Sequence, residues 1–467
     1  MLNIFINLNL YNSSGDDMKK KLILYIIVII ILIIALVLMF TNKKAESIKI
    51  ECTVLYNEDN LLTVQDSNNV IYTFYEEQVS LTVGDSVVLE YSGLLDKTKT
   101  VQSGEIIDYE ETDVLTDENG IPLNWLDDGI FSTYYVVAYN KLKSLTLDEK
   151  IGQLLLVRYS DTAKNDLNEY DFSGFVFYEK DFTGKTKNEV INMINELQQN
   201  SKIPLLTAVD EEGGKVVRIS SNPNLRSEKF KSPQELYSEG GFNLISSDTK
   251  EKSTLLKSLG LNLNLAPVVD VSTDSNDYIY PRTIGLDEQL TADYAKTVIQ
   301  ASKGLGISYT LKHFPGYSSN SDTHTSTSID DRTYDEILND LLPFQVGIET
   351  GAEAVLVSHN VVSAIDSDNP SSLSSNIHNL LRADLGFTGV AITDDISMSA
   401  LDEIDKTALA AILAGNNLVI TTDYETSFKE IKNAITNGDI SEKYVDELAF
   451  KVLAWKYHKG LMVENVK

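Results

Sequence analysis

The sequence predicts an α/β protein whose larger part is a (β/α)8 barrel, preceded by a transmembrane helix and a small all-β module. Three observations lead to this prediction: an unbroken apolar run near the N-terminus, a following stretch with period-2 alternation, and a long remainder in which short apolar segments alternate with helical patterns. A chain of 467 residues also exceeds the usual size of one domain.

The composition excludes several classes of protein. The 39 basic and 69 acidic residues give a net charge of -30, so nucleic acid and a flat anionic lipid surface would both be repelled. The single cysteine, Cys52, allows neither an intrachain disulfide nor a cysteine metal cluster. We therefore expect no nucleic-acid partner, and an acidic surface that serves mainly solubility.

The apolar run covers residues 22–40 and is long enough to cross a bilayer as one helix. The lysines at 19–21 place residues 1–21 in the cytoplasm and the remainder outside, as a single-pass protein of the cell membrane. A cleaved signal peptide is the weaker alternative, because the end of the run lacks small residues at cleavage-site spacing. Met18 is an alternative start, which leaves open whether residues 1–17 belong to the native protein.

Residues 46–110 alternate apolar and polar positions, as in Ile48, Ile50, Cys52 and Val54. Tight-turn residues interrupt the pattern, so short strands forming a small β-barrel or sandwich are expected. No residue in this range suggests chemistry, and a spacer or docking role is the default. Residues 111–135 are acidic and turn-rich, and we expect a linker.

Residues 136–467 alternate strand and helix patterns, and helices are expected for example over 187–199, 292–304 and 334–347. The eight predicted strands cover 154–159, 174–178, 204–209, 263–269, 309–313, 354–358, 390–393 and 418–421. Eight such units fit a (β/α)8 barrel. An open doubly wound sheet is the alternative, but no G-x-G-x-x-G loop follows the first strand.

Polar residues gather at the C-terminal ends of these strands, where a barrel enzyme places its functional side chains. The strand ends carry Asp210, Asp270, Lys312-His313, Ser358-His359-Asn360 and Asp394. One such residue could merely cap the next helix, but five in succession on one face are hard to explain as caps.

Asp394 follows a buried strand pattern, and its carboxylate would project into the barrel mouth. Such a carboxylate suits nucleophilic attack on an anomeric carbon, although a helix cap is an equally good interpretation of the residue alone. Asp322 and His324 would share one side of an extended segment, so the carboxylate could orient the imidazole for proton transfer. Taken alone, a segment rich in Ser, Thr and Asp with one histidine is usually only a polar loop, and this interpretation is favoured until the ends of the fifth and seventh strands are considered with it.

Five further residues have donors and acceptors suited to sugar hydroxyls and an amide carbonyl: Asp210, Arg218, Arg282, Lys312 and His313. Each in isolation is more often structural. Several histidines and aspartates are potential metal ligands, but no H-x-x-x-H or H-E-x-x-H pattern occurs. A metallohydrolase is therefore the weaker interpretation, and we expect no metal and no organic cofactor.

Taken together, these segments resemble glycoside hydrolase family 3, in particular its short exo-β-N-acetylglucosaminidases. The matching segments are VDEEGGKVVR (209–218), LGLNLNLAPVVDV (259–271), PRTIG (281–285), KHFPG (312–316), DTH (322–324) and ITDDISM (392–398). They lie in family order within about residues 140 to 460. The number and order of these segments make the resemblance specific.

The resemblance implies a retaining mechanism through a covalent glycosyl-aspartate, with Asp394 as nucleophile, His324 as acid/base and Asp322 as the partner of His324. It also implies sugar-binding roles for Asp210, Arg218, Arg282, Lys312 and His313. The longer β-glucosidase branch takes its acid/base from a second domain, whereas this chain ends at 467, shortly after the barrel.

Two departures from the family pattern concern substrate preference more than reaction type. Tyr317-Ser318 stands where His-Gly is usual, and Lys215 stands where arginine is common. The expected function is removal of terminal β-linked N-acetylglucosamine from glycans such as peptidoglycan fragments, by a membrane-anchored enzyme with its catalytic part outside the cytoplasm. A glycosidase or phosphorylase for another β-glycoside, and a catalytically silent glycan-binding barrel, stay open as alternatives.

Overall fold

The structure, a computed structural model, describes residues 47–58, 61–66, 70–75, 81, 84–99, 101–112, 116–317 and 328–463. Within these residues no helix combines the length and the apolar character needed to cross a membrane. The predicted anchor at 22–40 and the predicted cytoplasmic segment 1–21 lie outside the described residues, as do Asp322 and His324.

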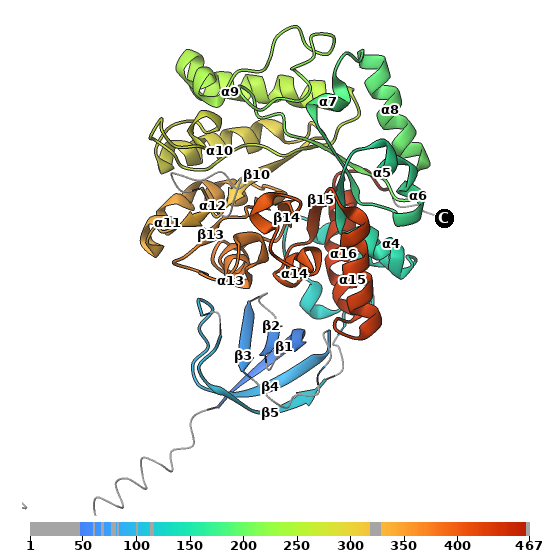
Figure 1. Cartoon of the computed structure of the whole chain (residues 1–467), viewed down its shortest axis with the longest axis vertical. Coiled ribbons are helices and arrows are strands. Elements are labelled where there is room, and N and C mark those ends of the chain that lie inside the picture. The colour runs from blue at the N-terminus through green and yellow to red at the C-terminus, as the bar shows by residue number, and fades with distance from the viewer. Residues whose placement is uncertain are drawn as a thin grey trace, which may run out of the picture.

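The N-terminal part is a five-stranded antiparallel sheet in the order β3-β2-β1-β4-β5, coloured blue in Figure 1. Its strands are β1 (Ser47–Glu58), β2 (Leu61–Asp66), β3 (Ile71–Tyr75), β4 (Ser86–Ser92) and β5 (Glu105–Glu111). Alternate side chains point to one face, as the period-2 pattern requires. Val54, Leu62, Val64 and Leu89 are fully buried on it.

The sheet is joined to the barrel by specific polar contacts. The side-chain amide of Asn379 donates to the carbonyl of Ile71 and accepts from its N–H, at 2.8 and 2.7 Å, as a neighbouring strand would. Lys443 donates to the hydroxyl of Ser86 at 2.9 Å. The edge of β3 is therefore covered by the barrel part instead of being left open.

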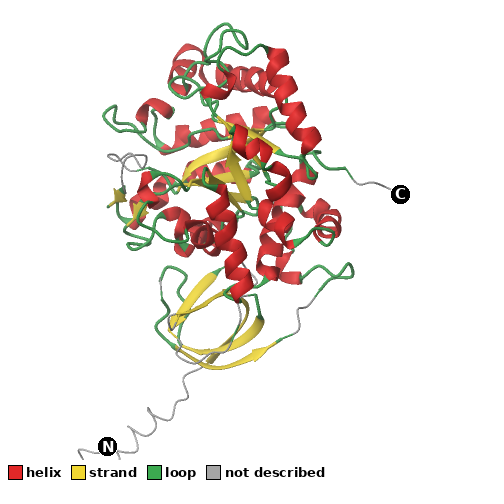
Figure 2. Cartoon of the chain, turned by 45° about the vertical axis from the view of Figure 1, so that its right-hand side comes forward, coloured by secondary structure: helices red, strands yellow, loops and turns green. Residues whose placement is uncertain are grey.

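The C-terminal part is a closed barrel of eight parallel strands in the order β6-β7-β8-β9-β10-β12-β14-β15, which Figure 2 shows at the centre of a ring of helices. The strands are β6 (Leu155–Arg158), β7 (Gly174–Phe177), β8 (Leu206–Val209), β9 (Leu263–Asn264), β10 (Ser308–Phe314), β12 (Ala354–Val357), β14 (Val390–Asp395) and β15 (Leu418–Thr421). All eight correspond to predicted strands. The predicted barrel is confirmed, and its closure excludes the open doubly wound sheet.

The helices surround this barrel. They are α3 (Tyr135–Leu142), α4 (Leu147–Gly152), α5 (Asp161–Asn165), α6 (Leu167–Tyr170), α7 (Glu179–Phe182), α8 (Lys187–Asn200), α9 (Pro233–Ser258), α10 (Glu288–Ser302), α11 (Tyr334–Asp340), α12 (Leu342–Glu349), α13 (Ser375–Asn379), α14 (Thr407–Leu413), α15 (Tyr424–Asn437) and α16 (Glu442–His458). The helix expected over 334–347 is in fact two, α11 and α12. Pro343 lies in the first turn of α12, where its missing N–H does not matter.

Short elements complete the fold. They are β11 (Ile329–Asp330), β13 (Val361–Val362), η1 (Leu123–Trp125), η2 (Ser132–Tyr134), η3 (Tyr280–Arg282), η4 (Ser371–Leu373), η5 (Leu380–Asp384) and η6 (Ser399–Leu401). Part of the range expected to be a linker is packed: Trp125 and Phe131 are buried, and the Trp125 ring lies 5.6 Å from that of Phe450 on α16. The connection between sheet and barrel is thus largely fixed.

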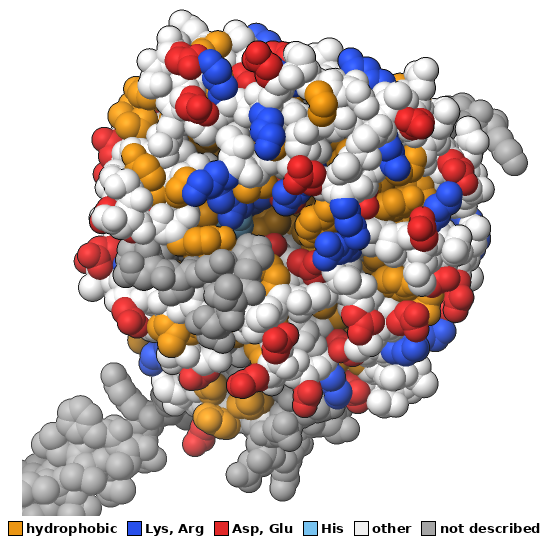
Figure 3. All heavy atoms as spheres, turned by 45° about the horizontal axis from the view of Figure 1, so that its top comes forward, with side chains coloured by type: hydrophobic (Ala, Val, Ile, Leu, Met, Phe, Trp, Pro, Cys, Tyr) orange, Lys and Arg blue, Asp and Glu red, His pale blue; other side chains and the backbone are white. Residues whose placement is uncertain are grey.

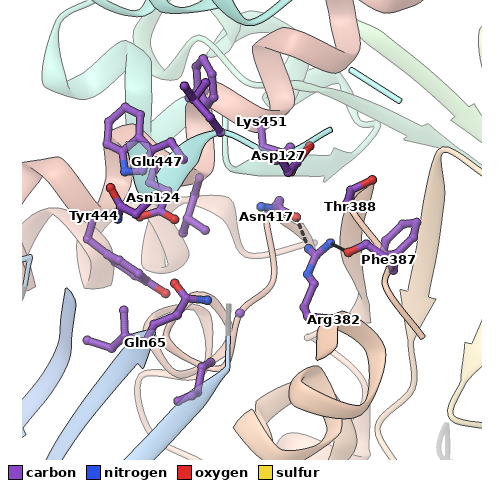
Figure 4. Close-up of a pocket in the computed structure, with 17 residues that line it drawn as sticks. Gln65, Asn124, Asp127, Arg382, Phe387, Thr388, Asn417, Tyr444, Glu447 and Lys451 are labelled. Atoms are coloured by element: carbon purple, nitrogen blue, oxygen red, sulfur yellow. Dashed lines mark hydrogen bonds and ion pairs between the residues drawn. The ribbon is translucent and has the colours of Figure 1, made fainter. Parts of the chain in front are cut away.

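Figure 4 shows a small polar cavity where the sheet, the connecting segment and α16 meet. Lys451 pairs with Asp127 at 2.6 Å, and Arg382 donates to Asn417 at 2.7 Å. Its volume is only about 60 Å³. Polar residues that line it are paired with one another, so we assign this cavity to the packing of the fold.

Candidate active site

A second, larger cavity of about 680 Å³ opens at the C-terminal ends of the barrel strands. This size is ordinary for a small-molecule site. All eight barrel strands or the loops after them contribute lining residues, among them Asp210, Lys312, His313 and Asp394. In Figure 3 the surface is hollowed near its middle, with Lys and Arg side chains around the opening and a histidine within it.

The loop after β8 is folded around one buried carboxylate. Glu211 accepts hydrogen bonds from the backbone N–H groups of Arg218 and Ile219, at 2.8 and 2.7 Å, and from the Ser220 hydroxyl at 2.5 Å. This closes the loop and leaves its neighbours Asp210 and Glu212 to line the cavity. Glu211 belongs to the segment 209–218 that resembles the family, and its carboxylate holds this loop in shape.

Lys312, at the end of β10, lies between the two carboxylates of that loop. Its Nζ is 2.9 Å from Asp210 and 2.8 Å from Glu212, and the side chain is almost fully buried. Burial alone would raise the pKa of both carboxyls, but the charges of nearby cations outweigh it and hold both pKa values below their ordinary range. Burial also works against the charged ammonium, yet the two carboxylates raise the pKa of Lys312. The three groups are therefore all ionised at neutral pH.

Arg282 joins this cluster to His313. Its guanidinium binds Glu212 through two nitrogens, at 3.0 and 2.7 Å, and lies 3.1 Å from His313 Nε2. Because arginine can only donate, Nε2 accepts and the ring proton is on Nδ1, which donates to Asp270 at 2.8 Å. Burial, assisted by the charges of Arg282 and Lys312, lowers the pKa of His313 despite Asp270.

Two arginines flank one tyrosine on the cavity wall. The guanidinium carbons of Arg158 and Arg218 lie 4.3 and 5.3 Å from the ring centre of Tyr178, and Arg218 also contacts Asp210 at 3.3 Å. Within the described residues the buried Nε of each arginine has no hydrogen-bond partner. Both arginines line the cavity, where their guanidinium groups can offer donors to a ligand. The sequence analysis missed Arg158 and Tyr178, although each lies at the end of a predicted strand.

Asp394 lies at the end of β14 and is partly exposed to the cavity. Its carboxylate accepts a hydrogen bond from the N–H of Asp395 at 2.9 Å. Burial alone would raise the pKa of Asp394, but His359, His313 and Lys312 outweigh it, so the pKa is lowered. The neighbouring Asp395 instead accepts from the N–H of Ser397 at 3.0 Å and so caps the turn after β14.

Asp322 and His324 belong to 318–327, outside the described residues, and their roles stay predictions. The described ends of that segment lie at the barrel mouth. Tyr317 donates its N–H to Asp270 at 2.9 Å and packs its ring on that of His313 at 5.1 Å. On the other side Ser328 accepts from the N–H of Val361 at 2.8 Å. Tyr317 thus packs against His313 and helps to hold it. Tyr317 stands where the family that the sequence resembles usually has histidine.

The structure brings together all six described members of the predicted site. Asp210, Arg218, Arg282, Lys312, His313 and Asp394 line the same cavity. Among the residues that the structure describes, there is no group of three or more His, Cys, Asp or Glu side chains that could hold a metal ion.

Comparison with known proteins identifies the family. Residues 146–454 match the glycosyl hydrolase family 3 N terminal domain. A beta-hexosaminidase of Xanthomonas campestris pv. campestris is 32% identical over 233 residues, which cover 49% of this chain and 69% of the relative. A beta-hexosaminidase of Nitrosomonas eutropha is 28% identical over 300 residues, covering 61% and 84%.

Solved structures agree with this assignment. A glycoside hydrolase family 3 beta-N-acetylglucosaminidase from Paenibacillus sp. is 27% identical with a TM-score of 0.64, and the match covers 69% of this chain and 64% of that one. A beta-N-acetylhexosaminidase from Beutenbergia cavernae is 25% identical with a TM-score of 0.61, covering 67% and 99%. The chain is therefore a glycoside hydrolase and belongs to glycosyl hydrolase family 3.

Proposed function

We propose that this chain is a retaining exo-β-N-acetylhexosaminidase that removes terminal β-linked N-acetylglucosamine. The observation that carries the proposal is the cavity at the barrel mouth. There the partly exposed carboxylate of Asp394, with its pKa lowered, shares a wall with an ionised Asp210–Lys312–Glu212–Arg282 cluster. The beta-hexosaminidase relatives support the choice of sugar.

In the proposed first step an oxygen of Asp394 attacks the anomeric carbon. The bond from that carbon to the glycosidic oxygen breaks, and this oxygen takes a proton from His324, which Asp322 orients. In the second step water attacks the same carbon and gives its proton to His324, which releases the sugar and restores the Asp394 carboxylate. A lowered pKa keeps Asp394 ionised and ready to attack.

The charged cluster would bind the sugar at the far end of the cavity from the leaving group. Asp210 can accept from sugar hydroxyls, while Lys312, Arg218 and Arg282 donate. His313 is fixed by Asp270 through Nδ1 and by Arg282 through Nε2, so it is held in position before substrate binds. These groups are already held by one another before substrate arrives, which reduces the cost of ordering them on binding.

We propose further that the enzyme acts on peptidoglycan fragments or related glycans outside the cytoplasm, anchored by residues 22–40. The apolar run and the lysines before it support the anchor. Cell fractionation of the full chain beside a chain lacking residues 1–40 tests it: the full chain should sediment with membranes and the shortened chain should not. Equal distribution of the two would contradict the anchor.

Release of 4-nitrophenol from its N-acetyl-β-glucosaminide tests the activity. The panel includes the β-glucoside and the β-xyloside, each with and without inorganic phosphate. We expect turnover of the N-acetyl-β-glucosaminide at a rate that phosphate does not change. Phosphate-dependent formation of a sugar phosphate would indicate a phosphorylase. Faster turnover of the β-glucoside or the β-xyloside would contradict the proposed substrate. Binding of a glycoside without turnover would indicate a catalytically silent glycan-binding barrel.

A further inference from the structure

His359 is a fully buried histidine beside the strand that carries Asp394. It follows β12 and does not line the cavity. Its Nε2 lies 3.0 Å from the carbonyl oxygen of Asp395, and its Nδ1 lies 2.7 Å from the hydroxyl of Ser372. Because a carbonyl only accepts, Nε2 carries the hydrogen and donates it. The mechanism described above uses this residue only through its effect on the pKa of Asp394.

The strand beside His359 is irregular at the point where it presents Asp394. The pairing of β14 with β15 joins Ile392 to Leu418 and then Asp395 to Ile420, so the register shifts between these pairs. At the shift the N–H of Ile420 donates a hydrogen bond to the hydroxyl oxygen of Thr393, at 3.0 Å. Such bulges re-aim a side chain next to an active site, but they interrupt the hydrogen bonds that fix a strand.

After the bulge, the peptide group between Asp395 and Ile396 is again hydrogen-bonded on both sides. Its N–H donates to the carbonyl of Ile420 on β15, at 2.9 Å. Its carbonyl accepts from His359, since β12 on the other side has already ended at Val357. The imidazole thus replaces the missing strand neighbour, and this peptide is held from both sides. The N–H of Asp395, one bond earlier in the chain, is the group that binds the Asp394 carboxylate.

The imidazole itself is held in place. Ser372, which contacts Nδ1, receives a hydrogen bond on its own carbonyl from the side-chain amide of Asn416 at 2.7 Å. Its N–H donates to the carbonyl of Ser358 at 2.9 Å, beside His359 in the chain. A ring fixed at both nitrogens cannot turn, so its Nε2–H stays directed at the Asp395 carbonyl.

We propose that His359 is a positioning residue, which clamps the Asp395–Ile396 peptide and thereby holds the bulge in the geometry that presents Asp394 to the anomeric carbon. The role of Asp394 as nucleophile rests on the proposed function. Displacing a reacting group by about 1 Å costs on the order of a hundredfold in rate. The clamp therefore affects chemistry more than substrate binding.

A pair of substitutions separates the two ring nitrogens. In His359→Gln the amide nitrogen reaches the place of Nε2 and can still donate to Asp395, whereas in His359→Asn it reaches only the place of Nδ1. We expect kcat on the 4-nitrophenyl N-acetyl-β-glucosaminide to fall about a hundredfold in the asparagine variant with KM nearly unchanged, and glutamine to restore most of it.

A substitution of His378 is the control for loss of stability. His378 is also buried, and its Nδ1 donates to the carbonyl oxygen of Ser374 at 2.9 Å. His378→Asn should lower Tm but leave kcat near wild type. If His359→Asn does not fold, Ser372→Ala tests the proposal in its place. This variant keeps the imidazole but removes the hydroxyl that contacts its Nδ1. A lowered kcat at a near-normal Tm supports the clamp, and an unchanged kcat contradicts it.

Crystal structures of the two His359 variants give a readout that needs no turnover. The asparagine variant should show the Asp394 carboxylate displaced and the glutamine variant should not. An Asp394 carboxylate that stays in place in both variants, or kcat values that follow Tm alone, would overturn the inference. If wild type cleaves no glycoside, the proposed function fails, and these structures still decide whether His359 sets the position of Asp394.

Discussion

Lys312 is the side chain on which most of the charged site depends. It contacts Asp210 and Glu212 directly, and its charge also lowers the pKa of Asp394 across the cavity. One buried cation thus helps to lower the pKa of carboxyls that follow two different strands, together with Arg282 at Glu212 and with His359 and His313 at Asp394. Its surroundings in turn raise its own pKa, so the charge persists over the working pH range.

Lys312→Met should therefore change the pH profile as well as the rate. We expect kcat/KM to fall about a hundredfold, because a donor to the substrate is lost from a buried site. Loss of the cation also raises the pKa of Asp394, so the ionised form disappears at a higher pH and the acidic limb of the profile moves upward. A profile of kcat/KM between pH 3 and 8, as an approximate range, measures this shift.

The matched control for this charge is Lys215→Met, which removes an exposed lysine on the same cavity wall. It should leave the acidic limb in place. An equal shift in both variants, or none in Lys312→Met, would mean that Lys312 does not set the ionisation of Asp394.

The loop after β8 shows how a single element fixes several site residues at once. Gly213 has φ of +107°, and a Cβ there would lie 2.2 Å from the carbonyl oxygen of Lys231. Only glycine fits both the backbone conformation and the space. This lets the loop turn sharply beyond Glu212 while Asp210 stays directed into the cavity.

We expect Gly213→Ala to lower the free energy of unfolding by roughly 3 kcal/mol, from left-handed strain and overpacking together. The control is Gly184→Ala, where φ is +74° but nothing lies within 4 Å of the added carbon. That variant should lose only about 1 kcal/mol from strain. Denaturant unfolding of both proteins measures the difference, and equal losses would contradict the close approach to Lys231.

The elements that the sequence predicted well are those with a local pattern. The eight barrel strands are short apolar runs, and Asp210, Lys312 and Asp394 were found because functional residues follow such runs. Glu212 and Arg158 were not proposed for the site, since their importance comes from partners far away in the chain. Glu212, for example, binds Arg282 across a separation of 70 residues.

The division of the helix expected over 334–347 was missed for a related reason. Apolar periodicity continues through Leu341 and Pro343, and only the proline marks the start of a new helix. Likewise, the acidic residues of 111–135 indicated a linker, whereas the buried side chains of Trp125 and Phe131 pack part of it onto α16, against Phe450 and His458. Composition describes the exposed side of such a segment and does not reveal its tertiary contacts.

For the whole molecule, the contact between sheet and barrel holds buried charges that give a pH-dependent stability. Burial raises the pKa of Glu447, on α16, to about 7, although Lys443 and Lys451 act against it. Its side chain faces the small cavity of Figure 4. Unfolding returns this carboxyl to an ordinary pKa of about 4.3. The folded state therefore binds the proton more tightly, and stability from this group falls as pH rises from about 4.3 to 7.

Glu447→Gln cannot ionise and should reduce the loss of Tm between about pH 5 and pH 8. Glu442→Gln, an exposed position on the same helix, is the control. Differential scanning calorimetry at the two pH values checks this expectation. If the glutamine at 447 leaves the pH dependence of Tm as in wild type, the contact between sheet and barrel is not where the protonation occurs.

The central claim concerns Asp394 as the nucleophile of a retaining enzyme, and trapping the covalent intermediate tests it most directly. A 5-fluoro-N-acetylglucosaminyl fluoride should glycosylate Asp394 and release fluoride. Its fluorine at C5 slows both steps, but the good leaving group speeds the first step, so the glycosyl-aspartate accumulates. Intact mass followed by peptide mapping locates the label. We predict one sugar on the peptide that contains Asp394, absent in Asp394→Asn. A label on another residue, or no label on an enzyme that turns over its substrate, would contradict the account.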